Sequence, residues 1–468
     1  MSNKTKNEKS GFVTLKEIFT NKRVLIAMLL TLFYVLFYHL GTMLTLPWVE
    51  LPSYDLSATS GNTFISMLNL LSGGGLKQVS IFAIGVGPFI TAQIIIQLLS
   101  SDLIPPLSRL AKSGERGKKK LEIITRLITL PFCIIQSYAI IAMIMNTGNV
   151  SMFGVNSLGA LSAGQIITMI TLMTSGTYIA IFIGDMISKR GVGNGITVII
   201  MAGIVGSLFT NFNVAFQSII GKIGNSSEIS VLTSMLSCAL YTLFFFLILL
   251  AVVFVNGSTR KIPIQQTGQG LTDDKEKLPF LPIKLNSAGV IPVIFASSIM
   301  TIPGTIAQFL PEDTAKWIIM DWFTLDSWTG ILMYVVFIIL FTFFYSYVQI
   351  NPSQLAENFE KSGKFIPGVR SGTDTEKHIS KVLSRVNWIG APFLALIAAL
   401  PYVLSIITGI PSGMALGGTG VIIMVTGSLE LWNSIKSAAT TTGYNVTKQQ
   451  ISSTYYEKDK DDDIKQLW

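Results

Sequence analysis

Residues 81–99 read IFAIGVGPFITAQIIIQLL, an uncharged run that is long enough to cross a bilayer. Gly85, Gly87 and Pro88 interrupt the run near its start, where a loosened backbone would be costly in lipid. Irregular backbone is tolerated at membrane depth where it faces protein or a water-filled path. The stretch therefore predicts a membrane helix beside a pathway, and the break serves either to aim side chains or to let the helix flex.

Composition places the whole chain among membrane proteins. Of its 468 residues, 50% are hydrophobic and 13% charged, and the mean hydropathy is +0.57. A soluble domain carries roughly twice that share of charge. Cys133 and Cys238 fall inside apolar stretches and are predicted to be small apolar filler. The ten predicted spans lie near 24–44, 80–100, 121–145, 160–186, 195–211, 231–255, 287–309, 329–350, 382–405 and 417–437.

Lysine and arginine divide unevenly between the predicted loops. With the N-terminus inside, the outer segments hold only Lys77, Lys222 and Lys316, which leaves 34 − 3 = 31 basic residues on the inner side. This asymmetry predicts cytosolic N- and C-termini. Residues 1–23 form the cytosolic N-terminal segment, in which GFVTLKEIFTNKRV (11–24) has the spacing of an amphipathic surface helix, with plain disorder as the alternative. Residues 438–468 form a cytosolic, charged tail.

The outer segment between the first two spans is unusually apolar. Residues 62–75, NTFISMLNLLSGGG, predict an amphipathic helix of about ten residues, too short to span. One interpretation is a helix resting on the outer interface. The other is a mobile or re-entrant element hinged at the three glycines 73–75.

Two short motifs repeat at an offset of five spans. GVGPFI (85–90) in span 2 matches GVIPVI (289–294) in span 7. VIIM (198–201), just after GVGNGIT, matches VIIM (421–424), just after GGTG. Together the matches predict two halves of five helices each, residues 24–211 and 212–437. Because five is odd, the second half enters from the opposite side, so the repeat is inverted and a pathway is expected between the halves.

The predicted spans contain few ionisable groups, and this limits the kinds of substrate that could pass through the membrane along them. A charge at mid-membrane is costly and is usually kept for function. The exceptions are His39 and groups near inner helix ends, for which we expect snorkelling or local capping: Glu122, Arg126, Asp185 and Glu430. Motifs of the HExxH, GxSxG and Walker A types do not occur in the sequence. An inverted-repeat secondary solute transporter and an intramembrane protease are therefore disfavoured, and no enzyme activity, cofactor or metal is expected.

The repeated motifs supply aliphatic side chains instead. Val86 and Ile90 share a helix face, as do Ile196 and Ile200, because each pair is four residues apart. Ile294 and Ile423 occupy the repeat-equivalent places of Ile90 and Ile200. If these faces converge between the halves, they form a greasy constriction that resists wetting.

These motifs resemble the SecY family of protein-translocation channel subunits over about residues 15–440. The stretches that carry the resemblance are SGGGLKQVSIFAIGVGPFITAQIIIQLL (72–99), GERGKKK (114–120), GDMISKRGVGNGIT (184–197), NSAGVIPVIFASSI (286–299), NPSQLAENFEKSGKFIPGVRSG (351–372) and LGGTG (416–420). The resemblance implies an all-α integral membrane protein with ten transmembrane helices in two inverted five-helix halves, arranged as a clamshell around an hourglass pore.

The resemblance also implies the parts of the pore. The pore ring matches the same six aliphatic positions, with Val86 where the family usually has isoleucine. The lateral gate, between spans 2 and 3 on one side and 7 and 8 on the other, matches Thr91, Gln136 and Asn286. Hydrogen bonds among these three would hold the gate shut, and the alternative is that each caps its own helix. The plug helix matches Thr63, Phe64, Ile65, Ser66, Met67, Leu68, Asn69, Leu70 and Leu71.

The resemblance extends to the inner loops 256–286 and 351–381, which are similar to the docking site for the motor ATPase SecA and for the ribosome. Arg260, Lys261 and Arg370 match the family's docking residues. Basic side chains suit an acidic protein surface and the phosphates of ribosomal RNA. The implied protein is the central translocase subunit of the bacterial cytoplasmic membrane, which passes unfolded secretory preproteins across and releases hydrophobic signal sequences into lipid. Its implied partners are SecE-type and SecG-type subunits, with no direct DNA binding.

Overall fold

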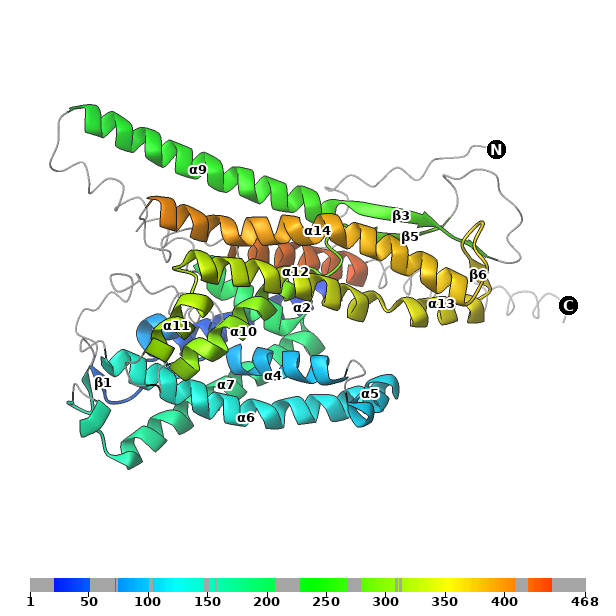
Figure 1. The fold of residues 1–468 in the computed structure, drawn as a ribbon. Helices are drawn as coiled ribbons and strands as arrows, with labels where there is room; N and C mark the ends of the chain where they lie inside the picture. The colour runs from blue at the N-terminus through cyan, green and yellow to red at the C-terminus, as the bar shows by residue number, and fades with distance from the viewer. Residues whose placement is uncertain are drawn as a thin grey trace, which may run out of the picture.

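The computed structural model describes residues 21–50, 72, 75–100, 104–146, 151–155, 158–206, 228–266, 279–307, 310, 314–408 and 420–439. Within this part of the chain, every one of the predicted spans contains a helix (Figure 1). Counting only residues that the structure describes in full, five helices are by themselves long and apolar enough to cross a membrane: α2 (Lys22–Thr42), α6 (Glu115–Asn146), α7 (Ala163–Arg190), α12 (Trp328–Ile350) and α14 (Thr373–Thr408). The chain is an integral membrane protein.

The first part of the bundle is built on α6. The short helices α4 (Gly87–Leu98) and α5 (Pro105–Lys112) both pack against α6. In turn, α6 packs against α7, and α7 packs against α2. The helix Gly195–Gly206 follows α7 directly. Gly195 approaches the backbone of Gly184 so closely that a Cβ atom there would overlap it. Minor elements are the 3₁₀ turns η1 (Gly75–Gln78) and η3 (Leu158–Ala160) and the strands β1 (Val49–Glu50) and β2 (Ser151–Met152).

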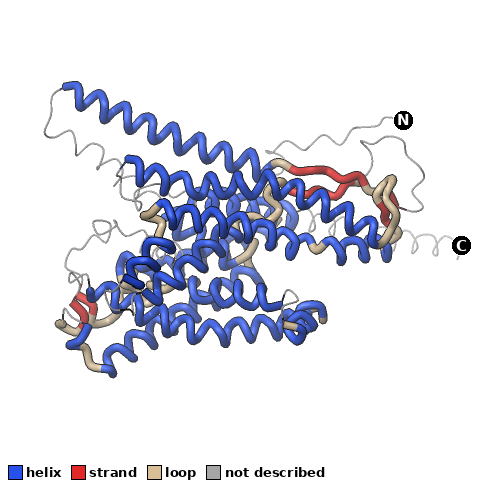
Figure 2. The backbone as a smooth tube through the Cα atoms, in the orientation of Figure 1, coloured by secondary structure: helices blue, strands red, loops and turns tan. Residues whose placement is uncertain are grey.

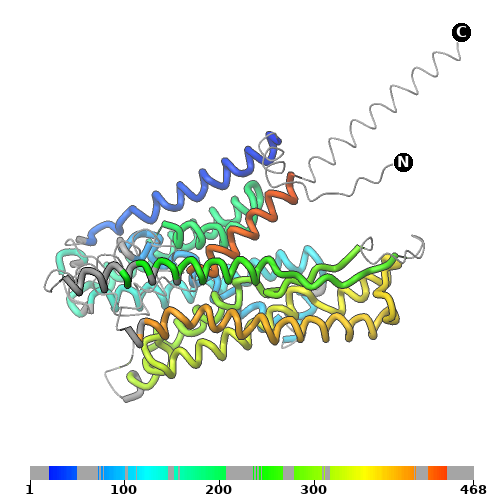
Figure 3. Tube along the Cα trace, turned by 90° about the horizontal axis from the view of Figure 1, so that it is seen from above, coloured from blue at the N-terminus to red at the C-terminus, as the bar shows by residue number. Residues whose placement is uncertain are grey.

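The second part of the bundle is built on α12 and α14, which pack along each other. α10 (Ile291–Ala307) packs against α12, and α11 (Thr314–Phe323) contacts both. α9 (Glu228–Gly257) crosses the outside of this group, as seen from above in Figure 3. A helix over 420–439 completes the described chain.

Among the described residues, three two-stranded sheets lie in the connections, at opposite ends of the bundle (Figure 2). β3 (Thr259–Pro263) pairs with β5 (Phe280–Lys284), and β4 (Gln265–Gln266) pairs with β6 (Lys364–Phe365). The second pairing joins the two long inner loops into one unit with α13 (Pro352–Lys361). This unit, here termed the inner unit, has its own core, which includes Ile262, Ile283, Ile366, Ile379 and Leu383.

Two spans begin later than the sequence predicts. Residues 80–86 are not helical, and α4 begins at Gly87; residues 287–290 are not helical either, and α10 begins at Ile291. The reason is the same in both places: Gly85 has φ +59° and Gly289 has φ +66°, a left-handed conformation that ends any helix before it. Pro88 and Pro292 follow as the second residues of α4 and α10, where a missing N–H is harmless.

One apolar core runs through both parts of the bundle. It holds side chains from α4 and α7 together with side chains from α10, α12, α14 and the 420–439 helix. α10 makes the connection, since it contacts α4 and α6 as well as α12 and α14. A contact surface between the two predicted halves therefore lies along α10.

Candidate functional site

The six aliphatic residues of the predicted constriction come together in that core. They extend from the turn before α4, from α4 itself, from the helix Gly195–Gly206, from α10 and from the 420–439 helix. Five are at most 6% exposed, and Ile196 is half-buried against the same core cluster. Such a cluster offers water no hydrogen-bonding group, so it excludes water and ions. These six, the ring residues, are Val86, Ile90, Ile196, Ile200, Ile294 and Ile423.

The two non-helical turns and the helix starts that follow them position three of these side chains. Val86 follows the positive-φ Gly85 and is fully buried. Ile90 lies one helical turn later on the same face of α4, and Ile294 occupies the matching place after Gly289 in α10. In the turn over residues 80–86, every residue is buried except Ile81, which is half-buried. The prediction that protein rather than lipid surrounds this break is confirmed.

The three predicted gate residues are all buried, at 2% exposure for Thr91, 5% for Gln136 and 4% for Asn286. Thr91 donates its hydroxyl to Gly87 O of its own helix at 3.1 Å. Asn286 donates from Nδ2 to Asn256 Oδ1 at 2.9 Å. The expected hydrogen bonding among the three is therefore wrong for Thr91 and Asn286 in this structure: Thr91 follows the local alternative, and Asn286 bonds to α9.

Asn256 is a polar partner that the sequence analysis missed. It is the penultimate residue of α9, and its Nδ2 donates to Val252 O at 3.0 Å and to Thr426 Oγ1 at 3.2 Å. The network thus ties α9, the turn before α10 and the 420–439 helix together. An asparagine at the inner end of an apolar span was the only available signal, because its partners are 30 and 170 residues away.

The predicted plug, Thr63 to Leu71, lies outside the described residues. The chain just after it is held firmly at Ser72, which is fully buried. The Tyr38 hydroxyl of α2 donates to Ser72 O at 2.9 Å, and the Tyr38 ring meets the Phe82 ring edge-on at 5.1 Å. Gly85 lies so near the Ser72 backbone that a Cβ atom would overlap it.

The ionisable groups near the inner ends of spans 3 and 4 form an ion-pair cluster instead of snorkelling separately. Arg126 Nη2 of α6 contacts both Glu122 and Asp185, and Asp185 belongs to α7. Tyr178 adds a second link between the helices by donating its hydroxyl to Arg126 O at 2.7 Å. The cluster therefore fastens α6 to α7. Over the described residues, no group of three potential metal ligands comes together.

The predicted docking residues all lie on the inner unit, and all three are exposed. Arg260 and Lys261 are neighbours on β3, and the Lys261 Nζ lies 4.8 Å from the centre of the Phe280 ring on β5. Arg370 lies between β6 and α14, and its carbonyl accepts a hydrogen bond from Thr375 at 2.8 Å. Among the described residues, none of the three has an ion-pair partner, so their charges face solvent.

One pair of opposite charges on the inner unit is neutralised by an ion pair. Lys361 donates to Glu357 Oε1 at 2.7 Å within α13, and this hydrogen bond lowers the pKa of the Glu357 carboxyl and raises the pKa of the Lys361 amine.

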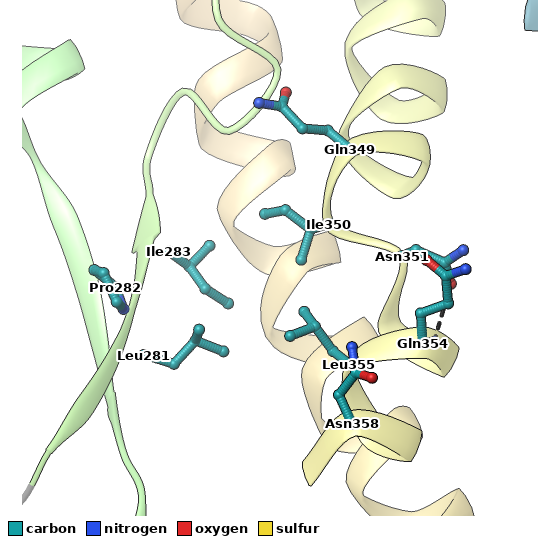
Figure 4. A pocket seen from close by; sticks show the side chains of 9 residues that line it. All are labelled: Leu281, Pro282, Ile283, Gln349, Ile350, Asn351, Gln354, Leu355 and Asn358. Carbon is teal, nitrogen blue, oxygen red and sulfur yellow. Dashed lines mark hydrogen bonds between the residues drawn. The ribbon is translucent and has the colours of Figure 1, made fainter. Parts of the chain in front are cut away.

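A cavity of about 270 Å³ opens between β5 and the α12–α13 turn (Figure 4). Its lining combines aliphatic side chains with a rim of amides from Gln349, Asn351, Gln354 and Asn358. The inner unit thus presents free cations beside a polar-rimmed cavity.

A family model named SecY matches residues 80–432. The chain belongs to the SecY family. It is 53% identical over 437 residues to the protein translocase subunit SecY of Mycoplasmoides gallisepticum, covering 93% of this chain and 86% of that protein. The fold is that of a solved protein-conducting channel, with a TM-score of 0.62 at 15% identity, over 89% of this chain and 92% of that one.

A canine Sec61 chain from a ribosome–channel complex has the same fold, with a TM-score of 0.58 at 14% identity and coverage of 89% and 92%. The predicted fold class, ten membrane helices in two inverted halves, is confirmed. The chain is a protein translocase subunit that forms a protein-conducting channel. The alternative function, that of an inverted-repeat secondary solute transporter, is not favoured by these similarities.

Proposed function

We propose that translocating polypeptides pass between the halves 24–211 and 212–437, through the six ring residues. The observation that carries the proposal is the burial of these side chains, from both sequence repeats, in a single apolar cluster. Aliphatic side chains seal against ions when the channel is idle and deform around an unfolded chain of varied side chains. The chain performs no chemical step itself.

The lateral gate opens between α4 and α6 on one side and α10 and α12 on the other. Contacts of α10 with both α4 and α6 support this assignment, because they are the seam that must part. Thr91 on α4, Gln136 on α6 and Asn286 in the turn before α10 are all buried. The plug, Thr63 to Leu71 within residues 62–75, closes the outer side, and its support is the family resemblance.

The inner unit docks the driving partner, a SecA-type motor or a translating ribosome, through Arg260, Lys261 and Arg370. Their exposure and lack of ion pairs among the described residues support this role, as does the ribosome complex of the canine relative. SecE-type and SecG-type subunits complete the channel in the bacterial cytoplasmic membrane. The 31 basic residues assigned to the inner side support cytosolic termini.

A stalled secretory chain tests the pore assignment. Single cysteines replace Val86, Ile90 and Ile294, and matched controls replace Leu127 and Leu250, which are 72% and 69% exposed on the outside of the bundle. We expect the stalled chain to cross-link to the three ring cysteines and to neither control. Cross-links to the controls alone would overturn the pore assignment.

Charge reversal tests the docking assignment. Arg370→Glu should lower transport of a precursor into vesicles at least about tenfold, equivalent to about 1.4 kcal/mol of docking energy. Expression should stay unchanged, because the side chain is exposed. Lys377→Glu, an exposed position of the same inner unit, is the matched control and should transport normally. Wild-type rates for Arg370→Glu would exclude the role.

A further inference from the structure

The exposed side of α12 ends in a tryptophan. α12 has 23 residues, so it is about 34 Å long and slightly exceeds the hydrocarbon core of a bilayer, which is roughly 30 Å thick. One side of the helix is buried in the common apolar core, and another is exposed at every fourth residue: Trp328, Leu332, Val336 and Leu340. An exposed aliphatic stripe on a membrane helix faces lipid. Trp328, the first residue of α12, therefore lies where the hydrocarbon ends, away from the inner unit.

Hydrogen bonds hold the end of α11 at the level of Trp328. The carbonyl oxygen of Asp321, on the last turn of α11, accepts a hydrogen bond from the Ser327 hydroxyl. Thr329 Oγ1 lies 2.9 Å from the same carbonyl oxygen and 3.2 Å from Asp321 Oδ2. Ser327 and Thr329 are the two neighbours of Trp328 in the chain. α11 also packs against both α10 and α12, at the end of the bundle opposite the inner unit (Figure 1), so it lies at the same boundary of the membrane.

α11 presents an exposed aromatic side at this boundary. Trp317, Ile318 and Trp322 are all exposed and lie within an arc of about 140° around the helix. Trp317 precedes Trp322 by about 7.5 Å along the helix axis, so the whole side lies near the level of Trp328. Over the part of the chain that the structure describes, the indole N–H groups of Trp317, Trp322 and Trp328 have no hydrogen-bond acceptor. This side therefore combines a large apolar surface with unused donors.

We propose that α11 is an interfacial anchor, whose partner is the lipid headgroup region of the leaflet farther from the inner unit. Tryptophan suits this region, because its ring packs on the upper acyl chains while its N–H donates to headgroup oxygens or water. A helix at such an interface buries its apolar face about 5 to 10 Å deep, which matches the extent of the aromatic side of α11. Because α11 contacts α10 and α12, the anchor fixes the level of both helices in the bilayer. The anchoring does not depend on the proposed pore or gate.

The depth of a spin label tests the anchor. The chain, with Cys133 and Cys238 replaced by alanine, is assembled with its partner subunits in vesicles of phosphatidylcholine and phosphatidylglycerol. A nitroxide at Ile318→Cys is compared with one at Leu332→Cys, in the lipid-facing stripe, and one at Lys377→Cys, on the exposed inner unit. The ratio of its collision rates with oxygen and with a water-soluble nickel chelate should lie between those of the two controls. A ratio that matches either control, or protection from both reagents by a covering protein, would overturn the proposal.

Tryptophan variants separate anchoring from mere exposure. With the label at Ile318→Cys, the double variant Trp317→Ala/Trp322→Ala should raise collisions with the nickel chelate roughly two- to threefold, because the helix loses its hold on the interface. Trp317→Phe/Trp322→Phe keeps the apolar rings and should cause a smaller rise. Trp388→Ala is the matched control, since Trp388 is exposed on α14, where its ring meets Phe343 edge-on at 5.8 Å. An unmoved label in the alanine double variant, or an equal rise from Trp388→Ala, would overturn the anchoring role.

Discussion

The turns before α4 and α10 have the same backbone and different surroundings. Each has a positive-φ glycine two residues before the helix and a proline in its first turn. Gly85 is covered by the Ser72 backbone, which Tyr38 holds. Gly289 faces a side chain, Glu430, whose Oε1 would lie 3.4 Å from an added Cβ atom. Both turns therefore have the backbone conformation that positions the ring residues, but different groups pack on their glycines.

The helices of the two halves are also held together by different kinds of interaction. In the first half, the ion pair between Arg126 and Asp185 joins α6 to α7. In the second half, the neutral network of Asn256 joins α9, Asn286 and the 420–439 helix. Ion pairs weaken in salt and amide networks do not. The two halves should therefore respond differently to the same perturbations.

Gly85→Ala should have the largest effect. An alanine in this conformation costs about 1 to 2 kcal/mol, and its overlap with the Ser72 backbone adds about 1 to 3 kcal/mol. We expect the apparent unfolding temperature of the purified channel to fall steeply, with poor accumulation in the membrane. Gly114→Ala is the control: Gly114 also has positive φ but has no atom near an added Cβ. Equal losses at the two sites would show that packing on Gly85 is unimportant.

Gly289→Ala should be milder. It carries the same backbone cost of about 1 to 2 kcal/mol, but its nearest neighbour is the tip of a side chain that can move. The channel should accumulate and show a smaller fall in unfolding temperature than Gly85→Ala. The two turns would count as equivalent if the two alanines proved equally harmful.

Much of the structure of the turns before α4 and α10 could be predicted from the sequence. The matching GVGPFI and GVIPVI strings indicated where the second and seventh spans are interrupted, because glycine and proline mark such places. The true helix starts, Gly87 and Ile291, were missed, since hydropathy cannot tell a buried irregular segment from a helix. The packing of Ser72 on Gly85 and of Glu430 on Gly289 could not be predicted, because it joins segments that are distant in the sequence.

The inner loops show a second limit of prediction from the sequence. Their basic character was readable, but the strands β3 to β6 were not predicted, since two- and five-residue strands rich in lysine and glutamine give little periodic signal. The pairing of β4 with β6 joins segments about 100 residues apart and is fixed by tertiary contacts. Asn256 was missed for the same reason.

Asp185→Asn should have a moderate effect that tests the charged fastener. It keeps the shape but removes the charge that meets Arg126, which we expect to cost about 1 kcal/mol because the pair is only partly shielded from solvent. The loss, measured as a fall in unfolding temperature, should shrink in high salt. Glu122→Gln removes the more exposed partner and should cost less. A salt-independent loss would contradict the electrostatic origin.

Tyr38→Phe should have the smallest effect and tests how Gly85 is covered. It removes one oxygen, and with it the bond to Ser72 O, while the ring keeps its contact with Phe82. A buried hydrogen bond in a membrane protein is worth about 0.6 kcal/mol on average, so the unfolding temperature should fall slightly. Because Ser72 O no longer accepts the Tyr38 bond, the Ser72 backbone can shift from an added methyl at a lower cost. The Gly85→Ala/Tyr38→Phe double variant should therefore lose less than the sum of the single losses. Strict additivity would mean that Tyr38 does not hold Ser72 against Gly85.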